Sequence, residues 1–425
     1  MLLQTALANV LFRMGSKHAF HQEGRESKNS EAALAKFAGI ETGSLPDSKT
    51  IDDVLNKLDH EEMNEVLMGL MEVLRKNKFF TSHKELMPNG FFHLAIDAET
   101  IHKYTPESAH DCEKCPYCLK RERGATTWYV HMQVVASIVC PGNLRLPLYV
   151  YPIHAKSLSC DGTISDEMFK QECELSSFSI ILGKIRDRFP KLHFCVLVDS
   201  LYANGPSMET IKKHRMEFMI VRKEGSMKTV GQDCDGLAQM PGHKVACQVE
   251  ETATENRKKV KRSWSFFNEI EYQNSKLNIL RFDEWVWDRE GNQIAYVHWE
   301  WIVSWKLTKR NAAATATRGR MRWLEEDLFN SVKNRGFKIK HDYSRHSNAQ
   351  IVWSILIMLA FLVTELFVLG TQVIAIIKNR SVKDFMRSVF ADFCKLCQIV
   401  FEAPILKRKV QFRYCFVKTY HRAEP

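Results

Sequence analysis

The stretch LHFCVLVD, residues 192–199, is an apolar run that ends in an aspartate. A continuous apolar run of this length predicts a strand buried on both faces, as in a parallel sheet. FFHLAID, residues 91–97, has the same form and also ends in an aspartate. Ligands of open α/β sheets lie beyond the carboxyl ends of the strands, so Asp97 and Asp199 should lie side by side if these two strands are neighbours.

Further strand and helix patterns surround these two runs. TTWYVHMQVVASIVC (126–140) and RLPLYVYPI (145–153) are rich in β-branched and aromatic residues, which predicts strands. A Ser/Asp start before apolar residues at helical spacing predicts a helix over 165–189. GPSMETIKKH (205–214) predicts another helix, and EFMIVRK (217–223) another buried strand. The resulting order, β-β-β-α-β-α-β, is that of a mixed α/β fold.

The rest of the chain divides by pattern into other units. Helical spacing dominates the N-terminal residues, and the helix RMRWLEEDLFNSVKNRGFKIKH (320–341) follows a series of strand-like runs joined by turns. We therefore predict a helical N-terminal region at 1–88, the first part of an α/β core at 89–224, a β-rich insertion at 225–316, the C-terminal helices of the core at 317–378, and a basic C-terminal tail at 379–425.

Composition narrows the class of protein. Hydrophobic residues make up 45% of the 425 residues and charged residues 26%, which excludes a disordered chain. The formal net charge of +10 suits a nucleic-acid partner, although many basic proteins bind none. The N-terminus has no basic n-region and no small-residue cleavage site, so twelve cysteines indicate reduced thiols or metal ligands in a cytosolic protein.

One apolar run, IVWSILIMLAFLVTELFVLGTQVIAII at 351–377, is long enough to span a bilayer. Glu365 lies near its middle, and an acid there is costly in lipid unless it has a partner. Basic residues flank the run on both sides, so no orientation is favoured. We expect a buried core helix and no membrane partner, with a membrane anchor as the alternative.

The two strand-end aspartates predict a metal site. Neighbouring carboxylates repel, and a divalent cation is the usual relief. Oxygen ligands of this kind favour Mg²⁺ or Mn²⁺, and a third acid from the helix at 320–341 would complete a site for phosphoryl transfer by two metal ions. Taken alone, either aspartate is more often a helix cap or turn former.

These pieces together resemble the insertion-sequence DDE transposases. LAIDAET carries the first aspartate, VLVDSLYANGP the second, and RWLEEDLFNSVKNRGFKIKH the acidic helix. Arg322, Glu326 and Lys333 match the R-x3-E-x6-K spacing of the family, while Gly319 stands where the family has tyrosine. The resemblance implies an RNase H-like α/β core (β-β-β-α-β-α-β-α) with a helical N-terminal region and a β-rich insertion.

The resemblance also implies an activity. Asp97, Asp199 and Glu326 would hold two Mg²⁺ (or Mn²⁺) ions for DNA cleavage at transposon ends and strand transfer into target DNA. Double-stranded DNA would be the partner, a homodimer the acting form, and the nucleoid in the cytoplasm the location. The alternatives are a related DNA nuclease, an inactive descendant that binds DNA, or a membrane-anchored protein.

The third acid has two neighbouring candidates. Arg322, Glu326 and Lys333 fall on one face of the predicted helix, where the two cations would grip phosphates. Glu325 lies at the border of the apolar face, close to Phe329 and Val332, and helix geometry alone does not exclude it. The family spacing favours Glu326.

The insertion offers candidate DNA contacts. Aromatic side chains stack on unpaired bases, and three tryptophans alternate in one strand-like run, although such residues also fill sheet faces. A basic run beside aromatics suits phosphate contacts, or else forms a solvated loop. The candidates are Trp299, Trp301 and Trp305, with Lys258, Lys259, Lys261 and Arg262; the basic segment at 406–422 is left equally open.

Cysteine spacing predicts a possible structural zinc site. HDCEKCPYCLK places Cys112, Cys115 and Cys118 at C-x2-C-x2-C spacing, with His110 just before them and His131 on the next predicted strand. Tetrahedral zinc needs four nitrogen or sulfur ligands, which the three cysteines and His131 would supply. Reduced free thiols are the alternative.

Overall fold

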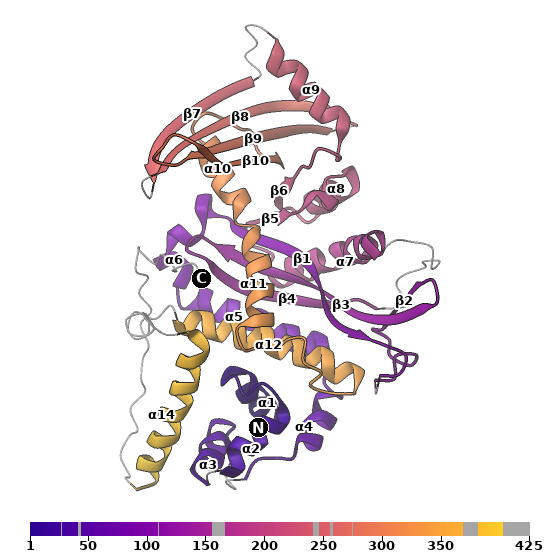
Figure 1. The fold of residues 1–425 in the computed structure, drawn as a ribbon, viewed down its shortest axis with the longest axis vertical. Helices are drawn as coiled ribbons and strands as arrows, with labels where there is room; N and C mark the ends of the chain where they lie inside the picture. The colour runs from indigo at the N-terminus through magenta and orange to yellow at the C-terminus, as the bar shows by residue number, and fades with distance from the viewer. Residues whose placement is uncertain are drawn as a thin grey trace.

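The computed structural model describes residues 1–26, 28–40, 44–108, 110–154, 166–240, 246–255, 258–273, 275–368 and 381–402. It is a mixed α/β structure in which one large sheet runs through the molecule and helices cover it (Figure 1). The predicted basic segment at 406–422 lies outside the described residues.

The N-terminal residues are helical. Asp47 and Asp59 cap two of these helices, because each carboxylate accepts a hydrogen bond from the backbone N–H two residues later. Apolar residues at helical spacing bury one side of the longest helix, including Met63, Leu67 and Met71. The helices are α1 (Leu2–Leu11), α2 (Lys17–Glu26), α3 (Lys28–Phe37), α4 (Ser48–Leu55), α5 (His60–Lys76) and α6 (Phe79–Ser82), followed by 3₁₀ turns at Lys84–Leu86 and Pro88–Gly90.

Five strands form the centre of the sheet in the order β4-β3-β1-β5-β6. β1 (Phe92–Tyr104), β3 (Thr126–Cys140) and β4 (Leu144–Pro152) form an antiparallel meander. β5 (Phe194–Val198) is parallel to β1, and β6 (Glu217–Val221) is parallel to β5. β1, which contains Asp97, and β5, which Asp199 follows, are therefore neighbours.

The first strand is longer than its apolar run. β1 continues seven residues beyond Asp97 to Tyr104, with a register shift between Thr100 and His102. The short β2 (Leu119–Arg123) pairs with the start of β3, beside β4 on the same edge. Asp97 is thus a residue within a strand, whereas Asp199 follows the end of β5.

Helices cover both faces of these strands. Ala95 and Leu197 belong to an apolar cluster with Ala312 and Ala316 of α10 (Ala312–Arg320). The alternate residues of the strands, such as Ile96 and Val196, pack in the main core with α7 (Asp166–Arg188). α8 (Gly205–Lys213) joins β5 to β6, and α11 (Trp323–Asn334) contacts β1, β3 and β4. Figure 1 shows α11 crossing the sheet.

The segment between β6 and α10 is β-rich and continues the same sheet. An antiparallel meander runs β7-β8-β9-β10, and β10 joins it to the central strands by pairing with β6. Trp301 lies opposite Val221 in this pairing. The elements are α9 (Lys228–Gln239), β7 (Ala246–Glu255), β8 (Lys258–Tyr272), β9 (Ser275–Trp287) and β10 (Gln293–Val303).

The long apolar helix is α12 (Ser347–Val368), and α14 (Val382–Glu402) follows it. Among the described residues, α12 is the one helix long and apolar enough to cross a membrane, but 72% of its most apolar window is buried inside the protein. Its Glu365 has a partner: both carboxylate oxygens accept hydrogen bonds of 3.0 Å from the fully buried Arg145 of β4. α12 is packed as a core helix against α1, α4, α5 and β4.

Candidate active site

Asp97 and Asp199 follow paired residues of two neighbouring strands. In the parallel pairing of β1 with β5, Ala95 is opposite Leu197, and each aspartate comes two residues later, Asp97 within β1 and Asp199 just after β5. Asp97 Oδ1 accepts a hydrogen bond of 2.9 Å from the backbone N–H of Ala98, and Asp199 Oδ1 accepts one of 2.9 Å from that of Leu201. Both side chains are partly exposed. Each aspartate therefore accepts a hydrogen bond from a nearby backbone N–H, and its side chain stays accessible to a ligand.

Glu325 brings a third carboxylate to this place. Its side chain is completely buried, and its Oε1 accepts a hydrogen bond of 3.0 Å from Ser137 Oγ of β3. Ser137 is paired with Ala95, so it lies on the same face of the sheet as Asp97. Burial raises the pKa of Glu325 well above its ordinary value, and the charge of Asp97 adds to the shift. Its Oε2 is buried with no hydrogen-bond partner among the described residues.

Glu326 points elsewhere. Its carboxylate forms an ion pair of 2.6 Å with Arg322, four residues earlier on the same helix, and its side chain is 35% exposed. Lys333 pairs with Glu99 of β1 at 2.7 Å. The structure thus brings Glu325 to Asp97, whereas the residues of the predicted R-x3-E-x6-K face pair with one another or with Glu99.

A fourth acid, missed in the sequence, stands near the same place. The phenol of Tyr202 is buried, and its pKa is raised by burial and then by the charges of Glu174, Asp199 and Asp97. Glu174 belongs to α7 and is 4% exposed. The hydroxyl of Tyr202 has no hydrogen-bond partner among the described residues. No sequence motif marks Glu174; a buried acid on the helix that covers β1 was the available signal.

The predicted stacking tryptophans have different surroundings. Trp301 is completely buried, and its ring would meet any side chain added at Gly319, so it is a core residue rather than an exposed platform. Trp299 is half-buried and stacks on Trp301 at 5.9 Å. Trp323, at the start of α11, is 51% exposed and meets the Trp299 ring edge-on at 6.5 Å. Of the two rings in contact here, Trp323 is exposed and Trp299 half-buried, and Trp305, the other predicted candidate, is also half-buried.

Two basic residues of β8 are exposed to solvent, and two form ion pairs with acids of the sheet. Lys258 and Lys259 are exposed, and the Lys259 ammonium lies 5.9 Å from the Trp287 ring centre. Lys261 pairs with Glu250 at 3.2 Å and lies over Trp285. Arg262 forms ion pairs with the carboxylates of Glu255 and Glu284, each at 2.7 Å. Arg262 is thus already neutralised by acids of the sheet.

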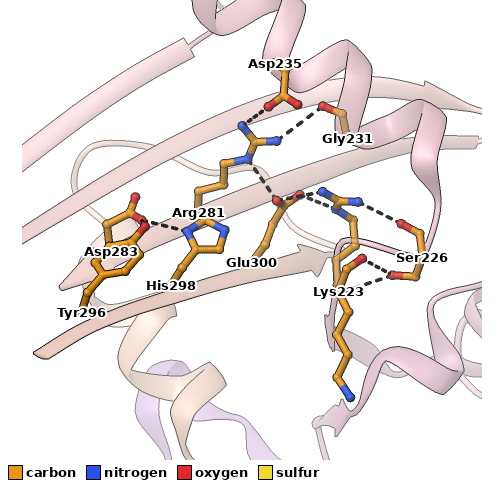
Figure 2. Close-up of polar contacts among 10 residues, drawn as sticks. Lys223, Ser226, Gly231, Asp235, Arg281, Asp283, Tyr296, His298 and Glu300 are labelled. Atoms are coloured by element: carbon orange, nitrogen blue, oxygen red, sulfur yellow. Dashed lines mark hydrogen bonds and ion pairs between the residues drawn. The ribbon is translucent and has the colours of Figure 1, made fainter.

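A buried ion network holds the β-rich segment against β6 (Figure 2). Glu300 of β10 is 4% exposed and accepts hydrogen bonds from Arg222, at 2.5 Å, and from Arg281 of β9, at 3.0 Å. Arg281 also reaches Asp235 of α9 at 2.7 Å. Because one carboxylate joins residues after β6, on β9 and on β10, the strand that carries Trp299 is fixed in relation to the central sheet.

The cysteine-rich loop forms a compact cluster with a changed membership. The ligand atoms of His110, Cys115, Cys118 and His131 all lie within 4.8 Å of one another, and all four residues are buried. Such a cluster could bind a metal such as zinc. Cys112 is not among these four: its Sγ contacts Ser108 Oγ at 3.9 Å. The predicted set had Cys112 where this cluster has His110; Cys112 is also buried and lies beside Cys118.

Comparisons with known proteins give a similarity to a solved structure but none to a family model or a curated sequence. No protein-family model matches the chain, and no curated protein matches its sequence. A cryo-EM structure of piggyBac transposase, in a synaptic complex with hairpin DNA, is similar over 95% of this chain and 72% of that chain, with 11% sequence identity and a TM-score of 0.35. We base the functional proposal on the geometry of the site and on the sequence motifs.

Proposed function

We propose that this protein is a DDE-type DNA transposase with an RNase H-like core, and that Asp97, Asp199 and Glu325 are its acids. The observation that carries the proposal is a completely buried glutamate placed beside an aspartate at the junction of two parallel strands. The strand order β4-β3-β1-β5-β6, with β3 antiparallel to its neighbours, supports this choice of core. The sequence motifs around the two aspartates support the same family.

The acids suit a pair of divalent cations. The charges of Glu325 and Asp97 repel each other, and Glu325 Oε2 has no partner among the described residues, so an oxygen-binding cation would relieve both costs. Asp97, Asp199 and Glu325 would hold Mg²⁺ or Mn²⁺. When bound, such ions stabilise the charge that develops on phosphate oxygens during in-line displacement. Ser137 keeps the Glu325 carboxylate oriented by donating to its Oε1.

Glu326, which the motif spacing favours, takes a different part in this proposal. Its ion pair with Arg322 holds that guanidinium at the start of α11, close to the exposed Trp323. Arg322 would contact a DNA phosphate, and Lys333 would hold Glu99 of β1. We therefore assign the third carboxylate to Glu325 and a positioning part to Glu326.

Double-stranded DNA, as transposon ends and target, is the proposed partner, with a homodimer as the acting form. The exposed Lys258 and Lys259 would contact phosphates, and their contribution should weaken with salt. Trp299 and Trp323 would stack on a base freed at the cleaved end. A DNA-binding descendant without activity would share these contacts and lack cleavage.

The test is cleavage of DNA that carries the ends of the element, recognised as short inverted repeats flanking the coding region. We expect Mg²⁺-dependent nicking by the native protein and its loss in Asp97→Ala, Asp199→Ala and Glu325→Gln. Glu326→Gln is the matched control and should keep at least about a tenth of the activity, as expected for an acid that binds no metal. DNA binding without nicking by the native protein would favour the inactive descendant.

The order of the two glutamate variants separates the assignments. If Glu326→Gln abolishes nicking while Glu325→Gln retains it, the third carboxylate is Glu326, as the spacing predicts. Nicking of any DNA irrespective of the repeats, without strand transfer, would indicate a nuclease instead.

A further inference from the structure

Four buried ligand groups meet where the loop between β1 and β2 folds against β3. Cys115 and Cys118 come from the loop, and the His131 Nε2 of β3 lies 3.3 Å and 3.0 Å from their respective Sγ atoms. His110 completes the group, with its ligand atom within 4.8 Å of the others. Two thiols and two imidazoles are thus collected in one place with little access to water.

The hydrogen bonds of His110 leave one nitrogen for a ligand. Its Nδ1 donates to the backbone carbonyl of Arg345 at 3.0 Å, in the segment just before α12. Its Nε2 is buried beside the thiol of Cys115. A carbonyl bound to one ring nitrogen is the usual way in which a metal-binding histidine is oriented. The imidazole is therefore held in the tautomer that a metal requires.

The spacing of the four ligand atoms is close to that of a zinc site. Zinc bonds of about 2.3 Å to sulfur and about 2.0–2.1 Å to nitrogen set tetrahedral ligand atoms roughly 3.3–3.8 Å apart. The observed limit of 4.8 Å needs only a small contraction of the loop.

We propose that His110, Cys115, Cys118 and His131 bind one structural Zn²⁺, and that Cys112 takes no part. Four protein ligands leave no open position, which is the mark of a structural rather than a catalytic zinc site. The ion would join the loop to β3 and, through His110 and the Arg345 carbonyl, to the start of α12. This site is independent of the proposed carboxylate site.

The test is the metal content of the full-length protein and of matched cysteine variants. We expect about one equivalent of zinc in the native protein, a full equivalent in Cys112→Ser, and less than about a tenth in Cys115→Ser. Cys112 is the matched control because it is an equally buried thiol three residues away. Loss of zinc from Cys112→Ser would overturn the ligand set, and iron or no metal in native protein grown with zinc would overturn the site.

A second variant tests the site if Cys115→Ser does not fold. His110→Gln keeps three ligands, and its zinc affinity, measured by competition with a chelating dye, should fall at least about tenfold below that of the native protein. Co²⁺ in place of zinc should give the visible absorption of a tetrahedral site in the native protein and in Cys112→Ser alike. An unchanged affinity in His110→Gln would exclude His110 as a ligand and overturn the proposal.

Discussion

Replacing Glu325 by glutamine should stabilise the metal-free protein while it abolishes DNA cleavage. The carboxylate is completely buried, its Oε2 has no hydrogen bond among the described residues, and Asp97 repels its charge. A buried polar group without a partner costs about 1–3 kcal/mol, and more when it is charged. Glutamine has nearly the same shape, can still accept the Ser137 hydrogen bond, and carries no charge, while its amide NH2 takes the unpartnered position of Oε2. Only the cost of the charge is removed, and Arg145 and Arg322 offset part of that cost, so a gain of about 1 kcal/mol is expected.

The gain should appear as a small rise in Tm. Unfolding entropy of roughly 2 cal/mol/K per residue makes about 1 kcal/mol equivalent to roughly 1 °C in a chain of 425 residues. The assay is thermal unfolding followed by circular dichroism, with EDTA and with Mg²⁺. Mg²⁺ at a hundred times its Kd should add about 2.7 kcal/mol to the native protein and little to the variant.

The difference in stability between Glu325→Gln and the native protein should depend on pH. Burial raises the pKa of Glu325, so the folded protein keeps a proton that the unfolded chain releases above about pH 4.3. The native protein therefore becomes less stable as the pH rises from about 4.3 toward the pKa that Glu325 has in the folded state. Because Glu325→Gln lacks this titration, its advantage should be small near pH 4 and larger at pH 8.

Glu326→Gln is the control for this reasoning. It breaks a partly exposed ion pair with Arg322, which is worth roughly 0–1 kcal/mol, so the variant should be equally or slightly less stable at every pH. If Glu325→Gln is less stable than the native protein in EDTA, or if its advantage does not grow with pH, the carboxylate is satisfied in a way that our account leaves out, and the metal site built on it fails.

Four further substitutions, two of them combined in one chain, test other parts of the structure. Trp301→Ala should cost about 3–5 kcal/mol in urea unfolding because the ring is completely buried. Trp323→Ala should leave stability within about 0.5 kcal/mol, since the side chain is 51% exposed, and should weaken binding of frayed DNA ends by about 1–3 kcal/mol in a gel shift. Arg145→Met should cost about 3–5 kcal/mol by leaving Glu365 without its buried partner, and Glu365→Gln in the same chain should restore part of that loss.

The order of strands and helices was predictable because it depends on local pattern. The runs at 91–97 and 192–199, the strands between them and the β-rich segment all appear as elements at the expected places. The length of β1 was not predictable in the same way, since the residues after Asp97 are held by pairing with β3 rather than by their own apolarity. Trp301 was left open between base stacking and a sheet face, and the pairing of β10 with β6 shows that it is inside.

The choice between two adjacent glutamates depends on which face of the helix meets the sheet. Glu325 precedes Leu328, Phe329 and Val332 by three, four and seven residues, so it belongs to the buried stripe of α11. A charged residue on such a stripe is costly unless function requires it, and this signal was present in the sequence. Motif spacing favoured Glu326 instead, but spacing along a helix does not say which face meets the sheet.

The metal cluster and the carboxylates share one pair of strands. β1 and β3 pair from Tyr104 opposite Tyr129 to His93 opposite Val139, with His131 near one end and Ser137 near the other. Loss of zinc should loosen the end at His131 first, because that is where the loop is attached. Ser137 lies beyond Val134 and Val135, which are completely buried, so it should keep its hydrogen bond to Glu325. Zinc removal should therefore lower stability more than it lowers the cleavage rate of the molecules that remain folded, and an equal loss of both would mean that the two sites are coupled.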